Sequence, residues 1–459
     1  MNYRESMSFL LSLSDYERNP AEALAPARYN LERVYKLLEL LDNPHRKLKC
    51  VHIAGTKGKG STAAMIAAVL SSAGYRTGFF SSPHLHDFRE RIRLDGGLIA
   101  EAELASIATR LRTAVDDVNS SHPHLGRLTT FEVTTALALV HFVERKAEFA
   151  VLEAGLGGRL DATNVVQALV SVITSISLDH TQVLGNTVAA IAHEKAGIVK
   201  RNGVVVCAPQ VPEAMDVIDQ AAEQHQARLL IVGQDYRWQA RLRQIGGDAS
   251  DLGHSSGEDF ATELDVQGPF GPYGNVRVPL LGAHQALNAA TAIAALDALR
   301  FHGIVLSPEA VCDGIASVRW PGRLEIIAKR PLLVVDGAHN ADSMAKLCHA
   351  LRESFRYRRL ILILGTSVDK DIAGIAGEVA AVADHVVVTR SNHPRSAPVE
   401  VIAAELDKHT STYSSSPDVV SALGAARRLT SPQDLICATG SLFIVAEVRE
   451  AVASRCPGA

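Results

Sequence analysis

The chain has 459 residues, a formal net charge of −4, and 47% hydrophobic against 21% charged residues. These values are typical of a globular protein with two or three domains, and they argue against nucleic acid as the main partner because no basic surplus exists. The six cysteines form no CxxC pair, which argues against a zinc site or a disulfide framework. No apolar run reaches about 18 residues, and the N-terminal one is too short for a signal peptide, so we expect a soluble cytoplasmic protein without membrane contact. We also expect a monomer.

The first two thirds of the chain alternate between apolar runs and amphipathic segments. Predicted strands cover residues 50–54, 75–80, 149–153, 169–176 and 204–208, and predicted helices cover 30–41, 61–72, 101–118, 131–146 and 283–299. This alternation predicts βαβ units, and hence a mostly parallel sheet with helices on both faces. Residues 237–275 are polar and glycine-rich, which favours short strands and loops, with a mobile surface loop over residues 246–258.

A second series of strands and helices begins near residue 324. Its predicted strands cover 332–336, 360–364, 385–389 and 435–438, and its predicted helices include 343–353 and 399–408. Trp320-Pro321-Gly322 is a plausible hinge between the two series. The predicted fold is α/β, with a P-loop ATPase-like parallel-sheet N-terminal domain (residues 1–318) and a smaller Rossmann-like C-terminal domain (residues 319–459).

A glycine-rich loop, Gly55-Thr56-Lys57-Gly58-Lys59-Gly60-Ser61, lies between a predicted strand and a predicted helix, in the order of a P-loop. Glycines let the backbone approach a phosphate, and the helix N-terminus adds partial positive charge. Lys59 can reach the terminal phosphates of ATP, and Ser61 or Thr62 can face a metal. Gly60 is an extra residue relative to the common G-x-x-x-x-G-K-[ST] pattern. The alternative is a plain tight turn that only starts a helix, but such a turn does not require two lysines among three glycines.

This variant loop resembles the phosphate loop of the Mur ligase superfamily, in particular that of folylpolyglutamate synthases and dihydrofolate synthases. Six further segments agree in the same order: FFSSPHL (79–85), LEAGLGGRLDATN (152–164), SLDHTQVLG (177–185), EKAGIVK (194–200), WPGRLE (320–325) and DGAHN (336–340). Together they span most of the chain. Lys57 is a departure, since bacterial members often carry Asn there, and it weakens any inference about source.

The resemblance implies that ATP binds with Mg²⁺, whose ligands would be Ser82, Glu153, His180 and a carbamylated Lys195. Hydroxyl and carboxylate oxygens suit this hard cation, whereas imidazole is a softer ligand. Judged without the resemblance, Ser82 could be a turn residue and His180 a capping or surface histidine. Lys195 could equally extend along a helix face with its amine in water.

Further positions match residues that contact the family's other ligands. Asn288 would lie near the adenine and Arg323 at the phosphates, while Asp336 and His339 would close over the nucleotide. The segments that would line a pteroate pocket contribute Phe131, Leu160, Asp161 and Ala162, and His393-Pro394-Arg395 would lie near the glutamate. For Asn288 a surface role stays open, and for Phe131 a core role.

The implied activity is an ATP-dependent amide ligase that adds L-glutamate to tetrahydrofolate through an acyl phosphate, with dihydropteroate as a second acceptor left open. Lys59, Lys195, His180 and Arg323 would be its catalytic residues. Two alternatives remain at this point. One is a related ligase that acts on a peptidoglycan precursor, and the other is a nucleotide-binding module without catalysis.

Overall fold

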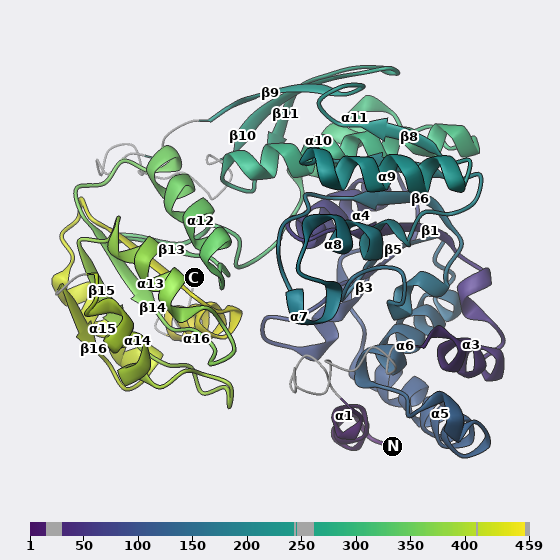
Figure 1. Ribbon diagram of the computed structural model, residues 1–459, viewed down its shortest axis with the longest axis horizontal. Helices are drawn as coiled ribbons and strands as arrows, with labels where there is room; N and C mark the ends of the chain where they lie inside the picture. The colour runs from purple at the N-terminus through teal and green to yellow at the C-terminus, as the bar shows by residue number, and fades with distance from the viewer. Residues whose placement is uncertain (15–29, 243–244, 246–260, 410–411, 455–459) are drawn as a thin grey trace. The chain divides into compact units, whose positions relative to one another are not determined.

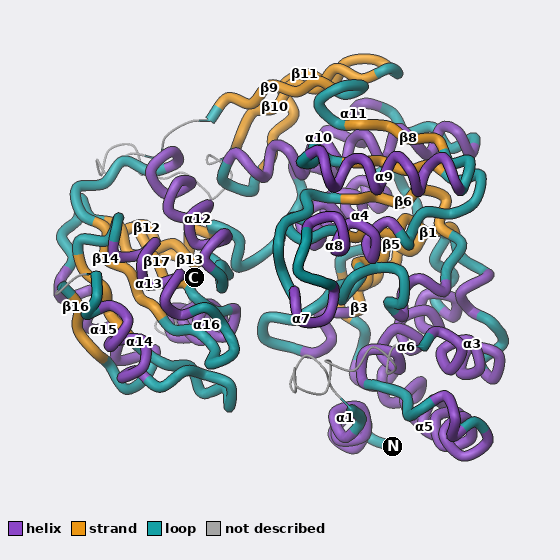
Figure 2. Tube along the Cα trace, in the orientation of Figure 1, coloured by secondary structure: helices purple, strands orange, loops and turns teal. Residues whose placement is uncertain are grey.

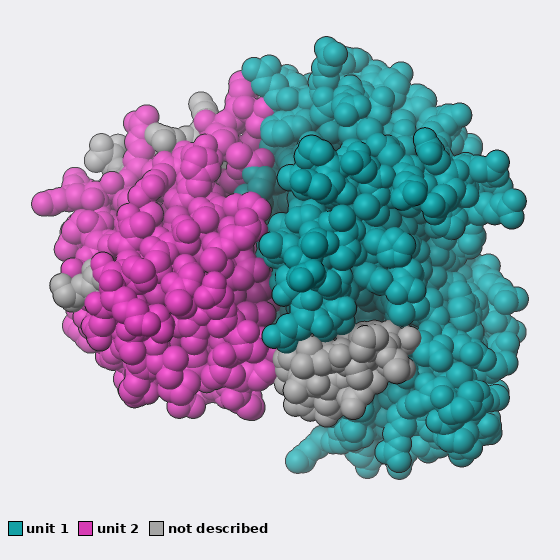
Figure 3. Space-filling model, viewed as in Figure 1, with its two compact units in different colours: residues 1–239, 264–276, 284–318 teal, residues 240–263, 277–283, 319–459 magenta. Residues whose placement is uncertain are grey.

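The structure is a computed structural model that describes residues 1–14, 30–242, 245, 261–409 and 412–454. The chain divides into two compact units, coloured separately in Figure 3. Unit 1 comprises Met1–Gln239, Leu264–Val276 and His284–Val318, and unit 2 comprises Ala240–Glu263, Arg277–Ala283 and Arg319–Ala459. The longest stretch of unit 2 begins at Arg319, while the predicted domain limits, 1–318 and 319–459, stay predictions.

Unit 1 is built on an eight-stranded sheet with the order β4-β3-β2-β5-β1-β6-β7-β8 (Figure 1). All neighbouring pairs from β2 to β8 are parallel, whereas β3 and β4 are antiparallel at one edge. The strands are β1 (Lys49–Ala54), β2 (Thr77–Phe80), β3 (Ile92–Leu94), β4 (Gly97–Leu98), β5 (Phe149–Glu153), β6 (Ala168–Ile173), β7 (Val204–Cys207) and β8 (Arg228–Ile231).

Helices cover both faces of this sheet, because its central strands are apolar on both sides. Side chains of α3, α5 and α6 form one core with Cys50, Phe80 and Leu152, while α4 contacts β1, β2 and β5 outside that core. The helices of unit 1 are α1 (Tyr3–Ser12), α3 (Leu31–Leu40), α4 (Lys59–Ser72), α5 (Glu101–Ser121), α6 (Thr130–Glu144), α7 (Thr181–Leu184), α8 (Val188–Ala196), α9 (Pro212–Gln224), α10 (Ala283–Ala298) and α11 (Pro308–Ala316).

Unit 2 contains a six-stranded sheet with the order β12-β13-β17-β14-β15-β16, in which only β12 is antiparallel (Figure 2). Its strands are β12 (Glu325–Lys329), β13 (Leu332–Val335), β14 (Leu360–Leu364), β15 (His385–Val388), β16 (Tyr413–Ser415) and β17 (Leu435–Thr439). Its helices are α12 (Ala341–Ser354), α13 (Ile372–Ala380), α14 (Val399–Leu406), α15 (Val419–Leu429) and α16 (Leu442–Ala453).

A three-stranded sheet, β11-β10-β9, follows the first series of strands. It consists of β9 (Arg237–Arg241), β10 (Thr262–Gly268) and β11 (Gly271–Val278), which confirms the short strands predicted there. The predicted surface loop over residues 246–258 lies outside the described residues. The α/β class and the mostly parallel sheets are confirmed, and none of the described helices combines the length and apolar character that a membrane crossing requires.

Candidate functional site

The phosphate loop follows β1 directly, and its last three residues, from Lys59 to Ser61, form the first turn of α4. Steric crowding explains two of its glycines. A Cβ on Gly55 (φ +150°) would lie 1.9 Å from Oγ1 of Thr174, and a Cβ on Gly58 (φ +88°) would lie 2.2 Å from Oδ1 of Asn288. Any larger residue would therefore push these neighbours away and strain the backbone.

Backbone bonds anchor the start of the loop on the segment after β6. The N–H groups of Thr56 and Lys57 donate to the carbonyl of Ser175 at 2.9 and 3.1 Å. The Thr56 hydroxyl donates to the carbonyl of Ser177 at 3.1 Å. The N–H groups of the first turn of α4 have no partner within the helix, which makes this helix start suitable for a phosphate.

Lys195 lies behind the loop and is buried. Its Nζ donates to the carbonyl oxygen of Gly55 at 2.7 Å. Burial, and next the positive charge of Lys59, lower the pKa of Lys195 from 10.5 to about 7. The alternative of an amine that reaches water along the helix face is therefore wrong.

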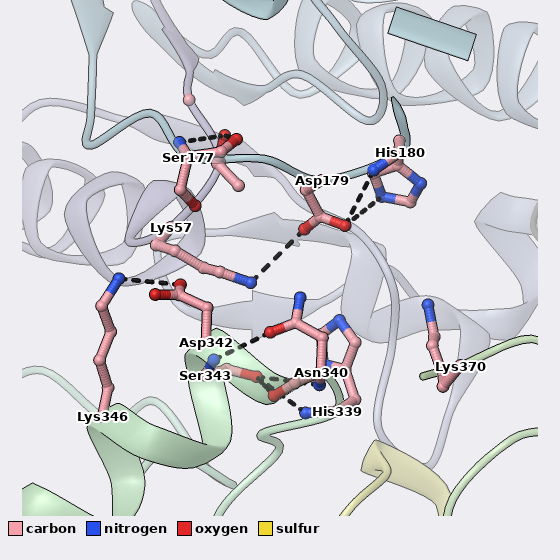
Figure 4. A network of polar contacts seen from close by, with 12 residues as sticks. Lys57, Ser177, Asp179, His180, His339, Asn340, Asp342, Ser343, Lys346 and Lys370 are labelled. Atoms are coloured by element: carbon pink, nitrogen blue, oxygen red, sulfur yellow. Dashed lines mark hydrogen bonds and ion pairs between the residues drawn. The ribbon is translucent and has the colours of Figure 1, made fainter. Parts of the chain in front are cut away.

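Lys57, from the same loop, points toward Asp179, as Figure 4 shows. Its Nζ lies 3.4 Å from Oδ2 of Asp179, whose Oδ1 accepts the backbone N–H of His180 at 3.0 Å. His180 has a left-handed backbone (φ 50°) at the start of α7, and its side chain is 52% exposed. No side-chain bond caps α7 there, so the capping alternative for this imidazole is wrong.

Glu153 is the last residue of β5, and Ser82 lies two residues after the end of β2, the neighbouring parallel strand. The Ser82 N–H lies 3.4 Å from Oε2 of Glu153, and the carboxylate is buried. Among the described residues, no three His, Cys, Asp or Glu side chains gather as a metal cage. Mg²⁺ needs only one or two protein carboxylates beside water and phosphate oxygens, so Glu153 with the Ser82 hydroxyl fits this ion.

Asp161 is buried in the turn that follows the glycine-rich segment 155–158. Its Oδ2 accepts the N–H of Leu156 at 2.9 Å, and its Oδ1 accepts the N–H of Thr163 at 3.0 Å. Burial raises the pKa of Asp161, and the hydrogen bond from the Thr163 side chain opposes that rise. Ala162 beside it is buried, and Leu160 is half-buried.

Phe131 lies at the start of α6 with its ring half-buried at the edge of the core. The ring centroid is 5.7 Å from that of Phe80. A Cβ on Gly155 would lie 2.7 Å from Cζ of Phe131, so the ring packs directly on the glycine-rich turn. The structure thus brings Phe131 together with the segment that carries Leu160, Asp161 and Ala162, and it supports both the core and the pocket interpretation.

Asn288 is buried on α10, so the alternative of a surface role is wrong. Its Nδ2 donates to Oε1 of Gln285 at 3.0 Å, and its Oδ1 is the atom that crowds Gly58. The side chain therefore contacts the phosphate loop from a segment more than 200 residues away in the sequence.

In unit 2, Asp336 follows β13 and connects its own segment, DGAHN, with the WPGRLE segment. Its Oδ2 accepts the N–H of Leu324 and its Oδ1 accepts the N–H of Ala338, both at 2.8 Å. The N–H of Gly337 donates to the carbonyl of Gly322 at 3.0 Å. A Cβ on Gly337 would lie 2.8 Å from Nη1 of Arg323, which places the guanidinium against this turn.

His339 belongs to the same turn. Its Nδ1 lies 2.8 Å from the carbonyl of Gly337. The backbone N–H of His339 donates to the hydroxyl of Ser343 at 3.0 Å (Figure 4). Asn340 caps α12 by accepting the N–H of Ser343. Further along unit 2, the ring of His393 stacks on Phe443 at 3.7 Å with an angle of 8°. Arg323, Asp336 and His339 thus meet around one turn of unit 2, and His393 lies in another segment.

Sequence reasoning missed three residues at this site. Asp179 lies in the matched SLDHTQVLG segment, where its acidic side chain was the available signal. Thr174 gave no signal, because a threonine just after a strand is an ordinary β residue until its contact is known. Thr163 lies in the matched LEAGLGGRLDATN segment, but its residue type did not by itself indicate a contact. Their roles come from the Gly55 and Asp161 contacts described above.

Comparisons with known proteins agree along the chain. The Mur ligase middle domain matches residues 53–296, and the Mur ligase glutamate ligase domain matches residues 322–442. The dihydrofolate synthase/folylpolyglutamate synthase of Bacillus subtilis (strain 168) is 32% identical over 422 residues, which cover 92% of this chain and 94% of that protein. Its counterpart in Escherichia coli (strain K12) is 33% identical and covers 88% of this chain and 87% of its own length.

Solved structures show the same fold. The Mycobacterium tuberculosis folylpolyglutamate synthase complexed with ADP and AMPPCP has a TM-score of 0.84 at 34% identity, covering 92% of this chain and 95% of that one. E. coli FolC in complex with DHPP and ADP has a TM-score of 0.84 at 31% identity, covering 99% and 98%. The chain therefore belongs to the folylpolyglutamate synthase/dihydrofolate synthase family of the Mur ligase superfamily.

Proposed function

We propose that this protein is an ATP-dependent ligase that joins L-glutamate to a folate. The observation that carries the proposal is the phosphate loop, whose helix start is open to an anion and whose Gly55 carbonyl holds the buried amine of Lys195. The family supplies the reaction class, because relatives over nearly the whole chain are named for this activity.

A carboxylate and an amine need activation to form an amide, because hydroxide is a poor leaving group. A carboxylate oxygen of the folate attacks the γ-phosphorus of ATP, and the bond to the ADP oxygen breaks. The glutamate amine then attacks the acyl carbon, phosphate leaves with the bonding electrons, and the amine releases its proton. The protein supplies position and charge, with Lys59 and the loop amides on the transferred phosphoryl group and Arg323 as a second cation.

Magnesium would be held by Ser82, Glu153, His180 and the carbamylated form of Lys195, and it would neutralise phosphate charge when bound. The pKa of Lys195 supports the modification. Only a neutral amine can attack CO₂, and a lysine with an ordinary pKa of about 10.4 is almost fully protonated at pH 7. The lowered pKa of Lys195 makes its neutral amine more available at this pH, so the N–C bond can form as the nitrogen gives up a proton.

The remaining site residues would divide between nucleotide and folate. Asn288 touches the phosphate loop and would lie near the base, and Asp336 and His339 would contact the nucleotide from the turn of unit 2. Phe131, Leu160, Asp161 and Ala162 would contact the pteroate, where a flat ring can stack on Phe131. Tetrahydrofolate is the proposed acceptor, and dihydropteroate is a second one because several relatives carry both names.

Release of ADP by the purified protein tests this function. We expect ADP only when ATP, Mg²⁺, a reduced folate and glutamate are all present, together with a folate product heavier by one glutamyl residue. ADP release with a peptidoglycan precursor and none with folates would favour the related ligase, and nucleotide binding without turnover would favour a non-catalytic module.

We also propose that the enzyme acts in the cytoplasm as a monomer. The described cysteines, Cys50, Cys207, Cys312, Cys348 and Cys437, are all free, which suits a reducing compartment. Light scattering behind size-exclusion chromatography tests the oligomeric state, and a mass near 49.1 kDa is the expected result.

A further inference from the structure

A buried hydrogen-bond chain runs from the middle of β1 to Asp161. Nε2 of His52 lies 2.7 Å from Oγ1 of Thr163, and that hydroxyl donates to Oδ1 of Asp161. His52 and Thr163 are fully buried. The chain thus connects the strand that leads into the phosphate loop with the turn that holds a predicted folate contact.

The direction of this chain follows from counting protons. An ionised carboxylate has no proton to donate, so Asp161 can only accept from Thr163. Both of its oxygens also accept backbone N–H groups, which favours this ionised form. A hydroxyl has one proton, so His52 must donate to Oγ1 from Nε2. Its Nδ1 then carries a lone pair, and this atom is among the buried side-chain atoms of the described residues that lack a hydrogen-bond partner.

A histidine is a costly residue for this position of the sheet. A buried polar atom without a partner destabilises the folded state, and an aliphatic side chain would avoid that cost. Burial, and next the charge of Lys200, hold the pKa of His52 well below its usual range, so the imidazole stays neutral with one N–H group. The ordinary explanation of a core histidine therefore accounts for the neutrality of the ring but leaves its unpaired nitrogen unexplained.

A second contact holds the same turn from the neighbouring residue. Nζ of Lys200 donates to Oδ1 of Asn164 at 2.7 Å and to its carbonyl at 3.1 Å, and Nδ2 of Asn164 donates to the carbonyls of Arg159 and Gly197 at 3.0 Å. The turn is therefore held through Thr163 and Asn164 in succession. Asp161 in turn accepts the N–H of Leu156, and this bond fixes the turn against the glycine-rich segment.

We infer that His52 and Thr163 are positioning residues that orient Asp161, and with it the 155–162 turn, for the pteroate part of the acceptor. This inference rests on the proposed function. His52 acts through Thr163, and neither residue is assigned a contact with substrate. The consequence is specific, because losing the chain should weaken folate use and leave nucleotide binding unchanged.

The test compares variants that keep or remove each donor. Thr163→Val removes the hydroxyl and keeps the shape, while Thr163→Ser keeps the hydroxyl. His52→Leu removes the imidazole, while His52→Gln keeps an N–H group near the place of Nε2. We expect the folate KM to rise about tenfold in Thr163→Val and His52→Leu, with recovery in Thr163→Ser and His52→Gln.

The double variant His52→Leu/Thr163→Val gives the sharpest readout. If the two residues form one chain, its folate KM should match that of the single variants, about tenfold above the parent, rather than about a hundredfold. Multiplication of the two single effects would overturn the inference. So would an unchanged folate KM in either single variant.

Two controls separate positioning from damage to the sheet. Ser171 faces His52 in register on β6, and its buried hydroxyl donates to the carbonyl of Ile198 at 2.8 Å, outside the chain. Ser171→Ala should leave the folate KM within about twofold of the parent. The ADP affinity of every variant should also stay within about twofold, because Gly55 follows only three residues after His52 and a distorted β1 would disturb it.

An equal loss of ADP affinity and folate affinity would overturn the inference, because it would show a general structural role. If His52→Leu fails to fold, the Thr163 pair and Ser171→Ala still decide the question. A parent protein that releases no ADP with any folate would defeat the proposed function instead, and an active parent with silent variants would defeat only this inference.

Discussion

The turn that carries Lys59 in unit 1 and the turn that carries Asp336 in unit 2 each follow a parallel strand, but different contacts hold them. Thr174 and Asn288, both distant in the sequence, press on Gly55 and Gly58 of the first turn. In the second turn, Asp336 accepts from the backbone of nearby residues. The first shape therefore depends on side chains from distant segments that press on glycines. The second depends on a carboxylate of the turn itself, together with backbone bonds that join Asp336 and Ala338 to Ala438 and Gly440.

Burial differs in the same way. Lys195 behind the first turn is buried with a strongly lowered pKa, whereas Arg323 against the second turn is half-buried. A preorganised buried site acts on a developing charge without moving, while a cation that is only half-buried loses more of its effect to water. Substitutions in unit 1 should therefore have larger effects on turnover than those in unit 2.

The largest effect is expected for Lys59→Ala. Removal of one group that stabilises phosphoryl charge costs on the order of 100-fold or more in turnover, and ADP release measures this directly. Lys57→Ala removes a lysine from the same loop whose amine is already paired with Asp179, so its loss should be clearly smaller. Equal losses of turnover in Lys59→Ala and Lys57→Ala would contradict the different roles given to the two lysines.

Lys195→Met should come next, because it removes the proposed carbamate while keeping an apolar stem. In protein equilibrated with ¹³C-bicarbonate, the carbamate signal in ¹³C NMR should grow as the pH rises through about 7, since the neutral amine increases in that range. Lys200→Arg is the control, because burial also lowers the pKa of Lys200 strongly, to about 8. Loss of the signal in that variant, or its presence in Lys195→Met, would contradict the assignment.

The same lysine predicts a pH dependence of stability. Between pH of about 7 and 10.5 the unfolded chain binds more protons at Lys195 than the folded one does, so the free energy of unfolding should rise with pH across this window. Lys195→Met should flatten that rise in urea unfolding experiments. An unchanged slope would show that this amine is not the group responsible.

Arg323→Ala should lower kcat about tenfold, a smaller loss than that of Lys59→Ala, with ADP affinity within about twofold of the parent. Arg323→Lys should recover part of the loss, because an ammonium keeps the charge but not the planar fork. A fall in ADP affinity as large as the fall in kcat would show that the guanidinium serves ground-state binding instead.

Asn340→Ala should give the smallest effect. The loss of this helix cap should reduce stability by about 1 kcal/mol in urea unfolding, with little change in turnover. Asp342→Ala removes the exposed pair with Lys346 and a carboxylate from the first turn of the same helix, and it should cost less than the loss of the cap because water screens both contributions. A larger cost for Asp342→Ala would contradict the importance of the cap.

The sequence predicted the phosphate loop and most strands because their signals are local. β1, α4 and β5 begin and end within two residues of the predicted limits, since glycine turns and apolar runs mark them. The contacts of Asn288 with Gly58 and of His52 with Thr163 could not be predicted in this way. They depend on the strand order and on which faces of β1 and α10 turn inward, and these follow from the packing of the whole unit.

The most direct test of the central claim is ADP release coupled to the mass of the folate product, measured with and without glutamate. The proposed function predicts one ADP per glutamyl residue added and no sustained ADP release when either folate or glutamate is omitted. ADP release at the same rate without folate, or a folate whose mass stays unchanged while ADP accumulates, would contradict it.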